Sequence, residues 1–445
     1  MARTNVAIVG GGIAGLIAAR QLLEAGLAVT LFEARDRLGG RIDTRHDFGP
    51  WPIELGAEFV HGRHPGLLRL VEEAGLHLQR RRFDPLVLQE GKDVSSAQSW
   101  DSVFEAMADP AAPDVGMKAR AQELAASGAI PASAERTLRR YVEGYMAADF
   151  ERVSARAIAE EQRAAEAIDS DHQTSIREGY DALVRHLARS LEHPGAVVML
   201  ATSVREVAWQ AGSVTIRTAR NGAAGPAPSF SHAVLTLPLG ILQLEPGEAG
   251  AITFVPEIRE KTAAARSLGM GNVVKLFLRF RTPLPQLPGL QPDVARKLEA
   301  MTFLQTPDKA VPTWWKTGNV EAPLLVGWAG GPLADRLSQL RDDEIVGAAL
   351  EALSSAVGVT PDLLAASVEE AAVADWRRDP FCRGAYSWIP AGALDARAVL
   401  AAPLAGTLFF AGEATDTAGY RGTVHGAIDS GVRAARELLD SISAR

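Results

Sequence analysis

Residues 5–41 read NVAIVGGGIAGLIAARQLLEAGLAVTLFEARDRLGGR, and this stretch decides the fold. The apolar run Val6–Val9 predicts a buried parallel strand, and a G-x-G-x-x-G turn follows it at Gly10, Gly12 and Gly15. Apolar spacing after the turn predicts a helix over 13–25, and a second strand ends at Glu33. This order of strand, glycine turn, helix and acidic strand end predicts a dinucleotide-binding unit.

Each of the three glycines has its own physical task in such a unit. One allows a sharp turn, one lets backbone N–H groups approach a pyrophosphate, and one lets the helix pack closely on the sheet. The helix N-terminus presents partial positive charge to the phosphates, and the Glu33 carboxylate accepts a ribose hydroxyl. Three glycines alone also suit a turn in an ordinary α/β protein. The flanking strand, and the acid 18 residues after Gly15, favour the nucleotide site.

Composition agrees with a soluble globular enzyme. A chain of 445 residues is too long for one simple core, so we expect two domains. The net charge of −8 argues against nucleic acid as a partner. The single cysteine, Cys382, excludes an intramolecular disulfide and a multi-cysteine metal site, and it suits a reducing cytoplasm. The histidines show no ligand spacing, so we expect no metal.

The apolar stretch Val6–Leu23 is the one segment that resembles a signal peptide. Four glycines and Arg20 interrupt it, and it runs directly into the strand that ends at Glu33. No run of 18 apolar residues occurs elsewhere. We therefore expect a cytoplasmic protein without a membrane span.

The middle of the chain changes character twice. An Ala-, Arg- and Glu-rich stretch from about 100 to 190 predicts a helical block. From 197 to 242 the pattern predicts strands, with a Gly/Pro/Ser loop at 221–231.

The second half alternates again and then repeats the opening order. Strands are predicted at 268–281 and 324–331, a Pro-rich loop at 284–296, and a helix at Asp342–Val357. Residues 408–439 again read as strand, glycine turn and helix. This interleaving predicts two discontinuous domains. The cofactor domain takes 1–82, 196–268 and 380–445, and the substrate domain takes 83–195 and 269–379.

Seven blocks in order resemble the flavin-containing amine oxidases, a family that includes monoamine oxidases, polyamine oxidases and histone lysine demethylases. The blocks are VAIVGGGIAGLIAARQL, FEARDRLGGRI, ELGAEFVHG, HAVLTLPLGIL, LGMGNVVKLFLRF, DWRRDPFCRGAYSWIPAG and FFAGEATDTAGYRGTVHGAIDSG. The resemblance spans nearly the whole chain. It implies an α/β fold in which a Rossmann-like, GR2-type FAD-binding domain is interleaved with a discontinuous α+β substrate domain of mixed sheet and helical block.

The resemblance also implies FAD as the cofactor. It places Glu33 at the adenosine ribose, Arg35 and Arg41 along the phosphates and the flavin side, Val204 at adenine, and Glu413 near the ribityl chain and pyrophosphate. A long cofactor held from both ends agrees with the second module at 408–439. The implied cofactor-binding residues are Gly10, Gly12, Ile13, Ala14, Gly15, Glu33, Ala34, Arg35, Gly39, Gly40, Arg41, Gly56, Ala57, Glu58, Val204, Pro238, Trp376, Gly412, Glu413, Gly422, Thr423 and Val424.

The implied chemistry is oxidation of an amine C–N bond. Hydride passes from the carbon next to nitrogen to flavin N5, the imine hydrolyses to an aldehyde or ketone, and O2 reoxidises the flavin to give H2O2. An amine with a pKa of about 10.4 must first lose its proton. An apolar, aromatic pocket favours that neutral form.

Three residues are the catalytic candidates: Lys275, Tyr420 and His61. Lys275 shares one strand face with Val273 and Phe277, and by itself it suits a lysine that snorkels at a sheet edge. Tyr420 by itself suits a packed loop tyrosine, and His61 a solvated loop histidine. The resemblance implies instead that Lys275 is hydrogen-bonded through water to flavin N5, that Tyr420 stands beside the flavin, and that His61 lies in the substrate channel.

Two positions depart from the monoamine oxidases, which pair two tyrosines against the amine and attach flavin through a cysteine. Ala385 occupies the place of the first tyrosine, with Tyr386 and Trp388 just after it. Gly384 occupies the place of the cysteine, and Cys382 lies two residues earlier, so we expect noncovalent FAD.

Phe59 replaces the arginine with which the L-amino-acid oxidases of the family hold a carboxylate. Glu58, its neighbour, faces either flavin or substrate. The expected substrate-binding residues are Phe59, His61, Ala385, Tyr386 and Tyr420.

The expected protein is an FAD-dependent oxidase of a primary, secondary or polyamine that uses O2 and is a monomer or homodimer. Two alternatives stay open. One is an FAD-dependent desaturase or porphyrinogen-type oxidase that acts on C–C bonds, and the other is a non-catalytic flavin-binding scaffold protein.

Overall fold

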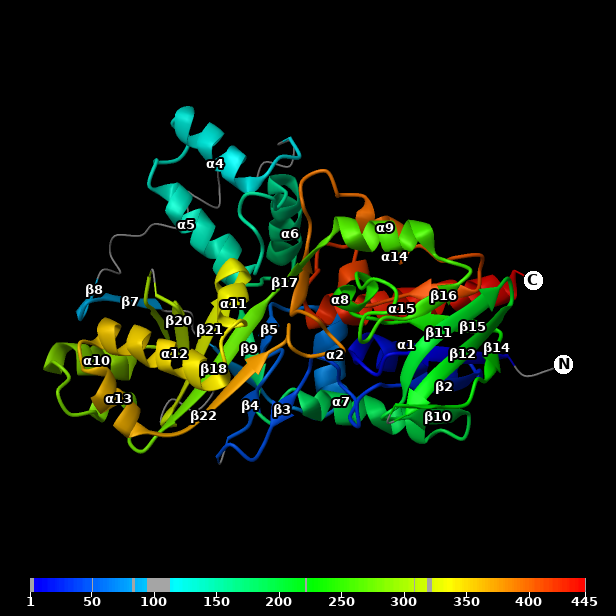
Figure 1. Ribbon diagram of the computed structural model, residues 1–445, viewed down its shortest axis with the longest axis horizontal. Coiled ribbons are helices and arrows are strands. Elements are labelled where there is room, and N and C mark those ends of the chain that lie inside the picture. The colour runs from blue at the N-terminus through cyan, green and yellow to red at the C-terminus, as the bar shows by residue number, and fades with distance from the viewer. Residues whose placement is uncertain are drawn as a thin grey trace.

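The computed structural model describes residues 4–49, 51–81, 85–93, 113–220, 222–307, 309–317 and 322–444. Figure 1 shows an elongated molecule in which two sheets, each with its own helices, lie side by side. Both chain ends lie at the same side of the molecule, next to the parallel sheet (Figure 1).

The half with the chain ends is built on a five-stranded sheet in the order β10-β2-β1-β15-β24, in which every pair is parallel. Its strands are β1 (Asn5–Val9), β2 (Ala28–Phe32), β10 (Ala196–Met199), β15 (His232–Leu235) and β24 (Leu408–Phe410). The runs are nearly continuously apolar because both faces of the sheet are covered. The predicted opening strand is confirmed, and it lies at the centre of the sheet.

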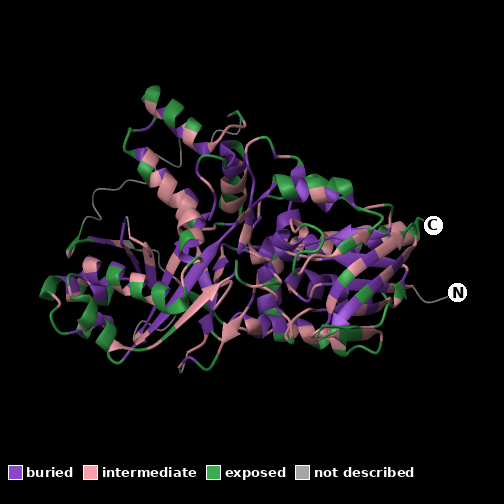
Figure 2. Ribbon diagram, in the orientation of Figure 1, coloured by how far each residue is buried: buried purple, intermediate pink, exposed green. Residues whose placement is uncertain are grey.

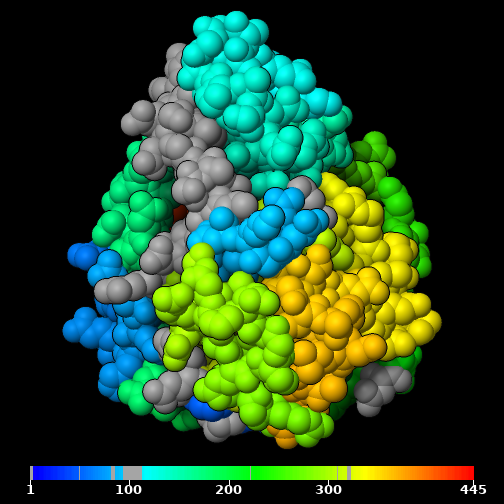
Figure 3. Space-filling model, turned by 90° about the vertical axis from the view of Figure 1, so that its left-hand side faces the viewer, coloured from blue at the N-terminus to red at the C-terminus, as the bar shows by residue number. Residues whose placement is uncertain are grey.

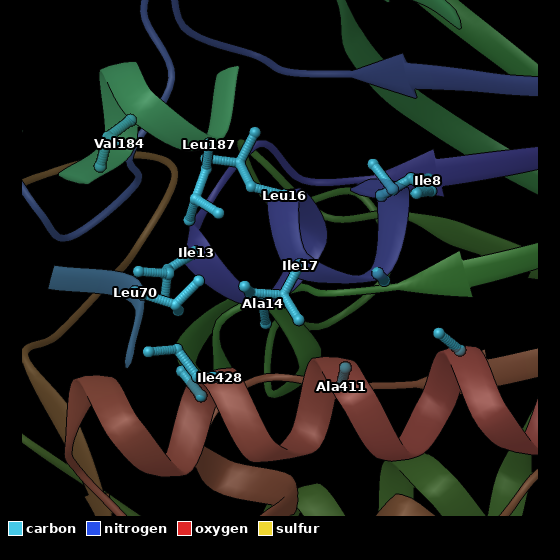
Figure 4. Packing of buried hydrophobic residues seen from close by; sticks show 14 of the residues in the cluster. Ile8, Ile13, Ala14, Leu16, Ile17, Leu70, Val184, Leu187, Ala411 and Ile428 are labelled. Atoms are coloured by element: carbon cyan, nitrogen blue, oxygen red, sulfur yellow. The ribbon is translucent and has the colours of Figure 1, made fainter. Parts of the chain in front are cut away.

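Four helices cover one face of this sheet: α1 (Ile13–Glu24), α2 (Pro65–Glu73), α7 (Asp181–Ala188) and α15 (Val424–Ser443). Figure 4 shows their shared core around Leu16 and Ile17 of α1, with Ile428 contributed by α15 and Leu187 by α7. The predicted helix over 13–25 is therefore confirmed to within one residue.

A second sheet covers the opposite face, in the order β13-β12-β11-β16 with β14 beside β12. Its strands are β11 (Ser203–Gln210), β12 (Ser213–Arg220), β13 (Ala223–Ala224), β14 (Ser229–Phe230) and β16 (Thr253–Val255). Val207 and Ile216 pack against Ala7 and Val9 of β1. The expectation of a loop throughout 221–231 was wrong at its ends, because β13 and β14 find backbone partners along β12.

The other half contains a seven-stranded mixed sheet in the order β22-β18-β21-β20-β19-β7-β8. Its strands are β7 (Pro85–Gln89), β8 (Lys92–Asp93), β18 (Val273–Phe280), β19 (Phe303–Gln305), β20 (Thr313–Lys316), β21 (Leu324–Gly330) and β22 (Val368–Asp375). Its helices are α10 (Pro292–Ala300), α11 (Gly331–Leu337), α12 (Asp342–Val357) and α13 (Pro361–Ser367). In Figure 2 the central strands β18 and β21 are mostly buried, whereas the outer faces of these helices are exposed.

Alternation along β18 separates two cores. Leu276 and Leu278 pack against the helices, whereas Phe277 packs on the opposite face with Phe48 and Val326. This strand lies between β22 and β21, so Lys275 sits on an interior strand and not at the sheet edge where a lysine could snorkel.

The Pro-rich stretch 284–296 was wrongly expected to be a loop throughout, because α10 begins inside it. Pro292 stands in the first turn of that helix. Backbone N–H groups in the first turn make no intrahelical hydrogen bond, so proline is tolerated there. The helix predicted at Asp342–Val357 is confirmed as α12.

The helical block is confirmed from residue 117 onward as α4 (Met117–Ala126), α5 (Ala134–Arg140), a π-helical segment (Tyr141–Tyr145), α6 (Ala155–Ala167) and α7. The prediction of helix was wrong at β9 (Gln173–Ile176), a strand that pairs with β5 (Phe59–His61) and β6 (Leu78–Arg80). Residues 94–112 lie outside the described residues. Figure 3 shows α4 and α5 (cyan) above the β7–β8 segment (blue), with the region of α10 (yellow-green) below.

Shorter elements connect these units: β3 (Thr44–Arg45), β4 (Ile53–Glu54), α8 (Leu239–Leu242), α9 (Arg259–Ser267), β17 (Gly269–Gly271), β23 (Tyr386–Trp388) and α14 (Ala396–Ala401). The expected domain boundary at 82/83 lies outside the described residues. The expected boundary 195/196 assigns α7 to the substrate domain. The apolar face of α7, however, packs against α1 in the core beside the parallel sheet. Within the described ranges, no helix has the length and apolar character needed to cross a membrane.

Candidate active site

One cavity of about 1950 Å³ is lined by residues of both the parallel and the seven-stranded sheet. Pockets for a single small ligand usually measure about 300–1000 Å³. The cavity therefore has room for a long cofactor together with a substrate.

The glycine turn before α1 forms one wall of the cavity. Gly10 has a φ of +114°, a backbone conformation that favours glycine. A Cβ atom on Gly12 would meet no described atom within 4 Å, so the chain leaves open space at the N-terminus of α1. The first N–H groups of a helix lack intrahelical acceptors and bind anions. This cradle fits a dinucleotide pyrophosphate.

Gly15 has a different place from the other two glycines. It does not line the cavity, and a Cβ atom there would lie 2.1 Å from the Gly10 carbonyl oxygen. Its task is the close packing of α1 on the turn, whereas the sequence predicted that one of the three glycines allows close packing on the sheet.

Glu33 lies beside this cradle at the end of β2. Its carboxylate accepts hydrogen bonds from Gly11 N (2.7 Å) and Arg35 N (2.9 Å). The Arg35 guanidinium donates to Asp379 Oδ1 (2.5 Å) and Cys382 Sγ (3.2 Å). Burial raises the pKa of the Cys382 thiol, although Arg35 opposes the shift. The thiol is thus neutral and held within the protein.

A second buried carboxylate, Glu413, lies near the N-terminus of α15. It accepts from Arg41 Nη1 (2.9 Å), Ser387 Oγ (2.7 Å) and Gly422 N (3.0 Å). Burial alone would raise the pKa of Glu413, but Arg41 and these hydrogen bonds outweigh burial and lower it. Thr423 caps α15 by accepting from Gly426 N (3.0 Å). This end of the cavity therefore holds a fixed ion pair and a capped helix N-terminus.

Lys275 is buried in the cavity wall, with 1% of its surface exposed. Its ammonium donates to Glu54 O (2.6 Å), Gly56 O (3.2 Å) and Glu58 Oε2 (3.0 Å). The β4–β5 connection thus supplies all three acceptors. The nitrogen also lies 5.5 Å from the centre of the Trp315 ring.

Glu58 joins Lys275 to two further donors, because Arg81 Nη2 (3.1 Å) and Trp315 Nε1 (2.9 Å) both donate to its Oε1. Burial would raise the pKa of Glu58, but Lys275 and Arg81 outweigh burial and lower it. Burial raises the pKa of the nearby Glu54 to about 8, which favours its neutral form. Two cations therefore share one buried carboxylate, and the cluster carries net positive charge.

Aromatic side chains line the chamber next to this cluster. Phe59 lies between Trp315 and His61, with ring centroids at 5.6 and 6.1 Å. Burial lowers the pKa of His61 to about 4, so its imidazole is neutral near pH 7. The chamber is therefore largely apolar at its surface.

Tyr420 belongs to a second aromatic group at the start of α15. Its ring contacts His64 and His425 edge-on, at 5.2 and 5.0 Å. Burial, with smaller effects of His64 and His61, lowers the pKa of His425 to about 3. His64 is held by Asp429, 2.9 Å from its Nε2 atom.

The family model of flavin-containing amine oxidoreductases matches residues 13–439 of this chain. The chain belongs to this family. Polyamine oxidase 4 of Oryza sativa subsp. japonica is 30% identical over 477 residues, which cover 98% of this chain and 89% of that protein.

Two solved structures share the fold. Putrescine oxidase bound to putrescine superposes with a TM-score of 0.75 at 21% identity, over 100% of this chain and 99% of that one. Cyclohexylamine oxidase from Brevibacterium oxydans superposes with a TM-score of 0.77 at 22% identity, over 99% and 100%. These structures confirm the predicted fold class.

As a member of this family, the protein is a flavin-dependent enzyme, and its activity is FAD-dependent amine oxidation. Among the described residues, no cluster of three or more His, Cys, Asp or Glu side chains is arranged to hold a metal ion.

The structure brings the predicted site residues of this flavoenzyme together around one cavity. Every residue that we named for cofactor, substrate or catalysis lines it except Gly15. Ala385 lies there through a backbone carbonyl that accepts from Arg41 Nη1 (2.6 Å). Tyr386 also lines the cavity, and its hydroxyl donates to Tyr145 O (2.6 Å). Trp388 packs into the core of the helical group and does not line the cavity.

Sequence reasoning missed several residues of the wall. Arg81 and Trp315 complete the Lys275 cluster, and Tyr141 and Tyr145 form a stacked pair at 5.3 Å. The i, i+4 spacing of the two tyrosines was a visible sign of a shared helix face. Nothing local marked Arg81 or Trp315, because both reach Glu58 only through tertiary packing.

Proposed function

We propose that this enzyme oxidises a small aliphatic amine with noncovalently bound FAD and O2 as the electron acceptor. The observation that carries the proposal is the buried Lys275–Glu58–Arg81 cluster in the wall of an aromatic chamber that is continuous with the dinucleotide cradle. Polyamine oxidases and a putrescine oxidase stand among the similar proteins, which supports an alkyl amine. No observation specifically favours a C–C desaturase or a scaffold protein.

The cofactor is proposed to lie along the cavity from Glu33 to Lys275. The N-terminus of α1 would face the pyrophosphate, Glu33 the ribose, and Arg41 with Glu413 the ribityl side. When bound, FAD supplies the hydride acceptor. The carboxylates and glycines named above would hold the bound FAD in place.

The aromatic chamber is proposed to hold the amine in its neutral form. Phe59, Trp315 and Tyr420 present little polar surface, so an ammonium would lose hydration there without an equivalent partner. Neutral His61 offers a hydrogen-bond acceptor without adding a positive charge. Lys275 would keep a fixed ammonium next to the reacting face, held by Glu58.

We also infer the two discontinuous domains of the sequence prediction, with the cofactor domain extended to include α7. A cytoplasmic location, and a monomer or homodimer, remain part of the proposal. A chain with a single cysteine suits a reducing cytoplasm.

Noncovalent attachment predicts release of the yellow cofactor on denaturation. Cys382 is buried and engaged by Arg35, and position 384 is glycine, so no thiol replaces the attachment cysteine of the monoamine oxidases. Acid precipitation of the holoenzyme should leave FAD in the supernatant. A pellet that keeps the flavin absorbance after washing would contradict this expectation.

Amine turnover is tested by a peroxide-release screen of the FAD-loaded protein. Alkyl monoamines, diamines, polyamines and amino acids are supplied aerobically, and H2O2 is measured with a coupled peroxidase. We expect release with alkyl amines and little with amino acids, since Phe59 stands where a carboxylate-binding arginine would be. If no amine led to H2O2 release, the proposed substrate class would be wrong.

A further inference from the structure

Glu54 is a buried glutamate that lies behind the cavity wall and does not line the cavity. Its backbone carbonyl oxygen accepts the shortest hydrogen bond of the Lys275 ammonium (2.6 Å). Its carboxyl oxygens accept from Tyr180 N (2.7 Å) and Thr44 Oγ1 (2.7 Å), and neither of these residues lines the cavity. Glu54 therefore connects the buried lysine to β3 and to the N-terminus of α7.

The backbone of the segment that holds Lys275 has little sheet pairing of its own. Strand β4 pairs with β3 at two positions, Thr44 opposite Glu54 and Arg45 opposite Ile53. A two-stranded ladder is marginally stable by itself even when it is longer than this. The carboxyl group of Glu54 adds two hydrogen bonds at the point where β4 ends. The β4–β5 connection, which supplies all three acceptors of Lys275, therefore owes part of its fixed position to this side chain.

The two partners of this carboxyl group are themselves held by the start of α7. Tyr180 is the N-cap residue of that helix, and it is buried in the core that α7 shares with α1 and α15. Asp181 N donates to Thr44 Oγ1 (3.0 Å). A Cβ atom on Gly179 would lie 2.7 Å from Thr44 Cγ2, so the turn before α7 lies directly against β3. Glu54 is thus fastened to the half of the molecule that carries the glycine turn.

The hydrogen bonds of Glu54, and not a negative charge, perform this task near pH 7. Burial raises the pKa of Glu54 to about 8, so its carboxyl group is largely neutral there. A neutral carboxyl group has one O–H donor and an acceptor oxygen. With its proton on Oε2, the group donates to Thr44 Oγ1 and still accepts from Tyr180 N, so the same pairs of atoms stay bonded. The amide of a glutamine could make both of these hydrogen bonds.

We propose that Glu54 is a positioning residue that fixes the Lys275 ammonium relative to the cofactor cradle. Its carboxyl group joins β4 to β3 and α7, and its carbonyl oxygen holds the lysine. Glu54 lies outside the cavity wall, so its effect on the flavin reactions passes through Lys275. This inference rests on the proposed amine oxidation, in which Lys275 acts beside the flavin, and adds a residue on which that lysine depends.

The kinetic test is a double-mutant cycle in the FAD-loaded enzyme, followed by stopped-flow absorbance. Glu54→Met keeps the length of the side chain without its oxygens, and it should slow by about 10-fold the flavin half-reaction that Lys275→Met slows. Glu54→Gln, which retains both hydrogen bonds, should stay within about 2-fold of the wild type. In the Lys275→Met enzyme, Glu54→Met should cause no further slowing, because the lysine that it positions is absent. An equal further slowing in that enzyme, or a wild-type rate in Glu54→Met alone, would overturn the proposal.

Asp114 offers a matched control, because its carboxylate also accepts from one hydroxyl and one backbone N–H. The donors are Ser154 Oγ (2.5 Å) and Gly392 N (2.7 Å), and Asp114 does not line the cavity. Asp114→Leu should lower the melting temperature, as Glu54→Met does, and leave both flavin half-reactions unchanged. If Asp114→Leu slowed them as much as Glu54→Met, a general loss of stability would explain the result and the positioning role would be wrong.

A second measurement follows Lys275 without any turnover. NMR of the FAD-loaded protein, with isotope-labelled lysine nitrogen, reports how fast the ammonium protons exchange with water, and Lys275→Met assigns the signal. Glu54→Met should speed exchange at Lys275 by about 10-fold, and Glu54→Gln should leave it unchanged. Lys261, also buried and bonded to backbone carbonyl oxygens, should keep its exchange rate in both variants.

Thr44→Val tests the same contact if Glu54→Met does not fold. It removes one partner of the Glu54 carboxyl group and keeps the side-chain shape, so exchange at Lys275 should rise by about 3-fold. Unchanged exchange at Lys275 in the variants that fold would overturn the positioning role. If these exchange rates change as expected while no amine is oxidised, the positioning role is supported and only the proposed oxidation is wrong.

Discussion

Lys275→Met should retain bound FAD and slow either flavin reduction by amine or reoxidation by O2 by about 100-fold, the scale seen when a fixed electrostatic group is removed from an active site. Methionine has a similar length but no charge, so the cavity wall keeps its shape and loses its ammonium. Glu58 remains bonded to Arg81 and Trp315, so its carboxylate is not left unpaired. The two half-reactions are measured by anaerobic and aerobic stopped-flow absorbance.

Lys261 offers a matched control for this substitution. It is also a buried lysine bonded to backbone carbonyls, those of Val399 (2.5 Å), Leu400 and Ala402 at the end of α14, but it does not line the cavity. Lys261→Met should reduce thermal stability and leave both flavin rates unchanged. Unchanged rates in Lys275→Met, with FAD content equal to the wild type, would exclude a catalytic role for Lys275.

Gly12→Ala should weaken FAD binding strongly while the protein still folds. The backbone of Gly12 has φ −73° and ψ 176°, which alanine adopts without strain, and its Cβ would enter open cavity space. That space is where a pyrophosphate would contact the N-terminus of α1. Close insertion of a methyl group costs about 1–3 kcal/mol, so FAD affinity should fall by up to about 100-fold. Flavin titration of the apoprotein measures the affinity, and thermal unfolding of the apoprotein measures the fold.

Substitutions at two other glycines distinguish an effect on FAD affinity from an effect on stability. Gly15→Ala should destabilise the apoprotein by about 3 kcal/mol, because its Cβ meets the Gly10 carbonyl oxygen and not a ligand. Gly347→Ala, in the middle of α12 with open space around its Cβ, should change FAD affinity little and stabilise the helix by about 0.5–1 kcal/mol. Normal FAD affinity in Gly12→Ala would contradict the proposal that the pyrophosphate binds at this cradle.

Local signals in the sequence were enough to predict most of the residues that form the candidate cofactor side of the cavity. The glycine turn, Glu33 and the second module at 408–439 are contiguous patterns, and the cavity wall includes Gly10, Gly12, Glu33 and part of the second module between Gly412 and Ala427. The errors have local causes too. Pro292 was taken as a sign of a loop although proline is well accommodated in the first turn of a helix, and β9 lay within a helix-rich stretch.

By itself the sequence determined the parallel sheet and the glycine turn of the dinucleotide cradle, because both depend on short-range periodicity and spacing. The resemblance to the family, and not the local pattern, singled out Lys275 as the lysine of interest. Only the tertiary structure decided what surrounds that lysine. Glu58, Arg81 and Trp315 come from three separate segments that only the folded chain brings together, and the hydrogen bonds of Glu58 to Lys275, Arg81 and Trp315 offset the cost of burying its carboxylate. The position of the π-helical turn that carries Tyr141 and Tyr145 was likewise decided by packing, since Trp328 of β21 and Tyr386 donate to its backbone carbonyl oxygens from far along the chain.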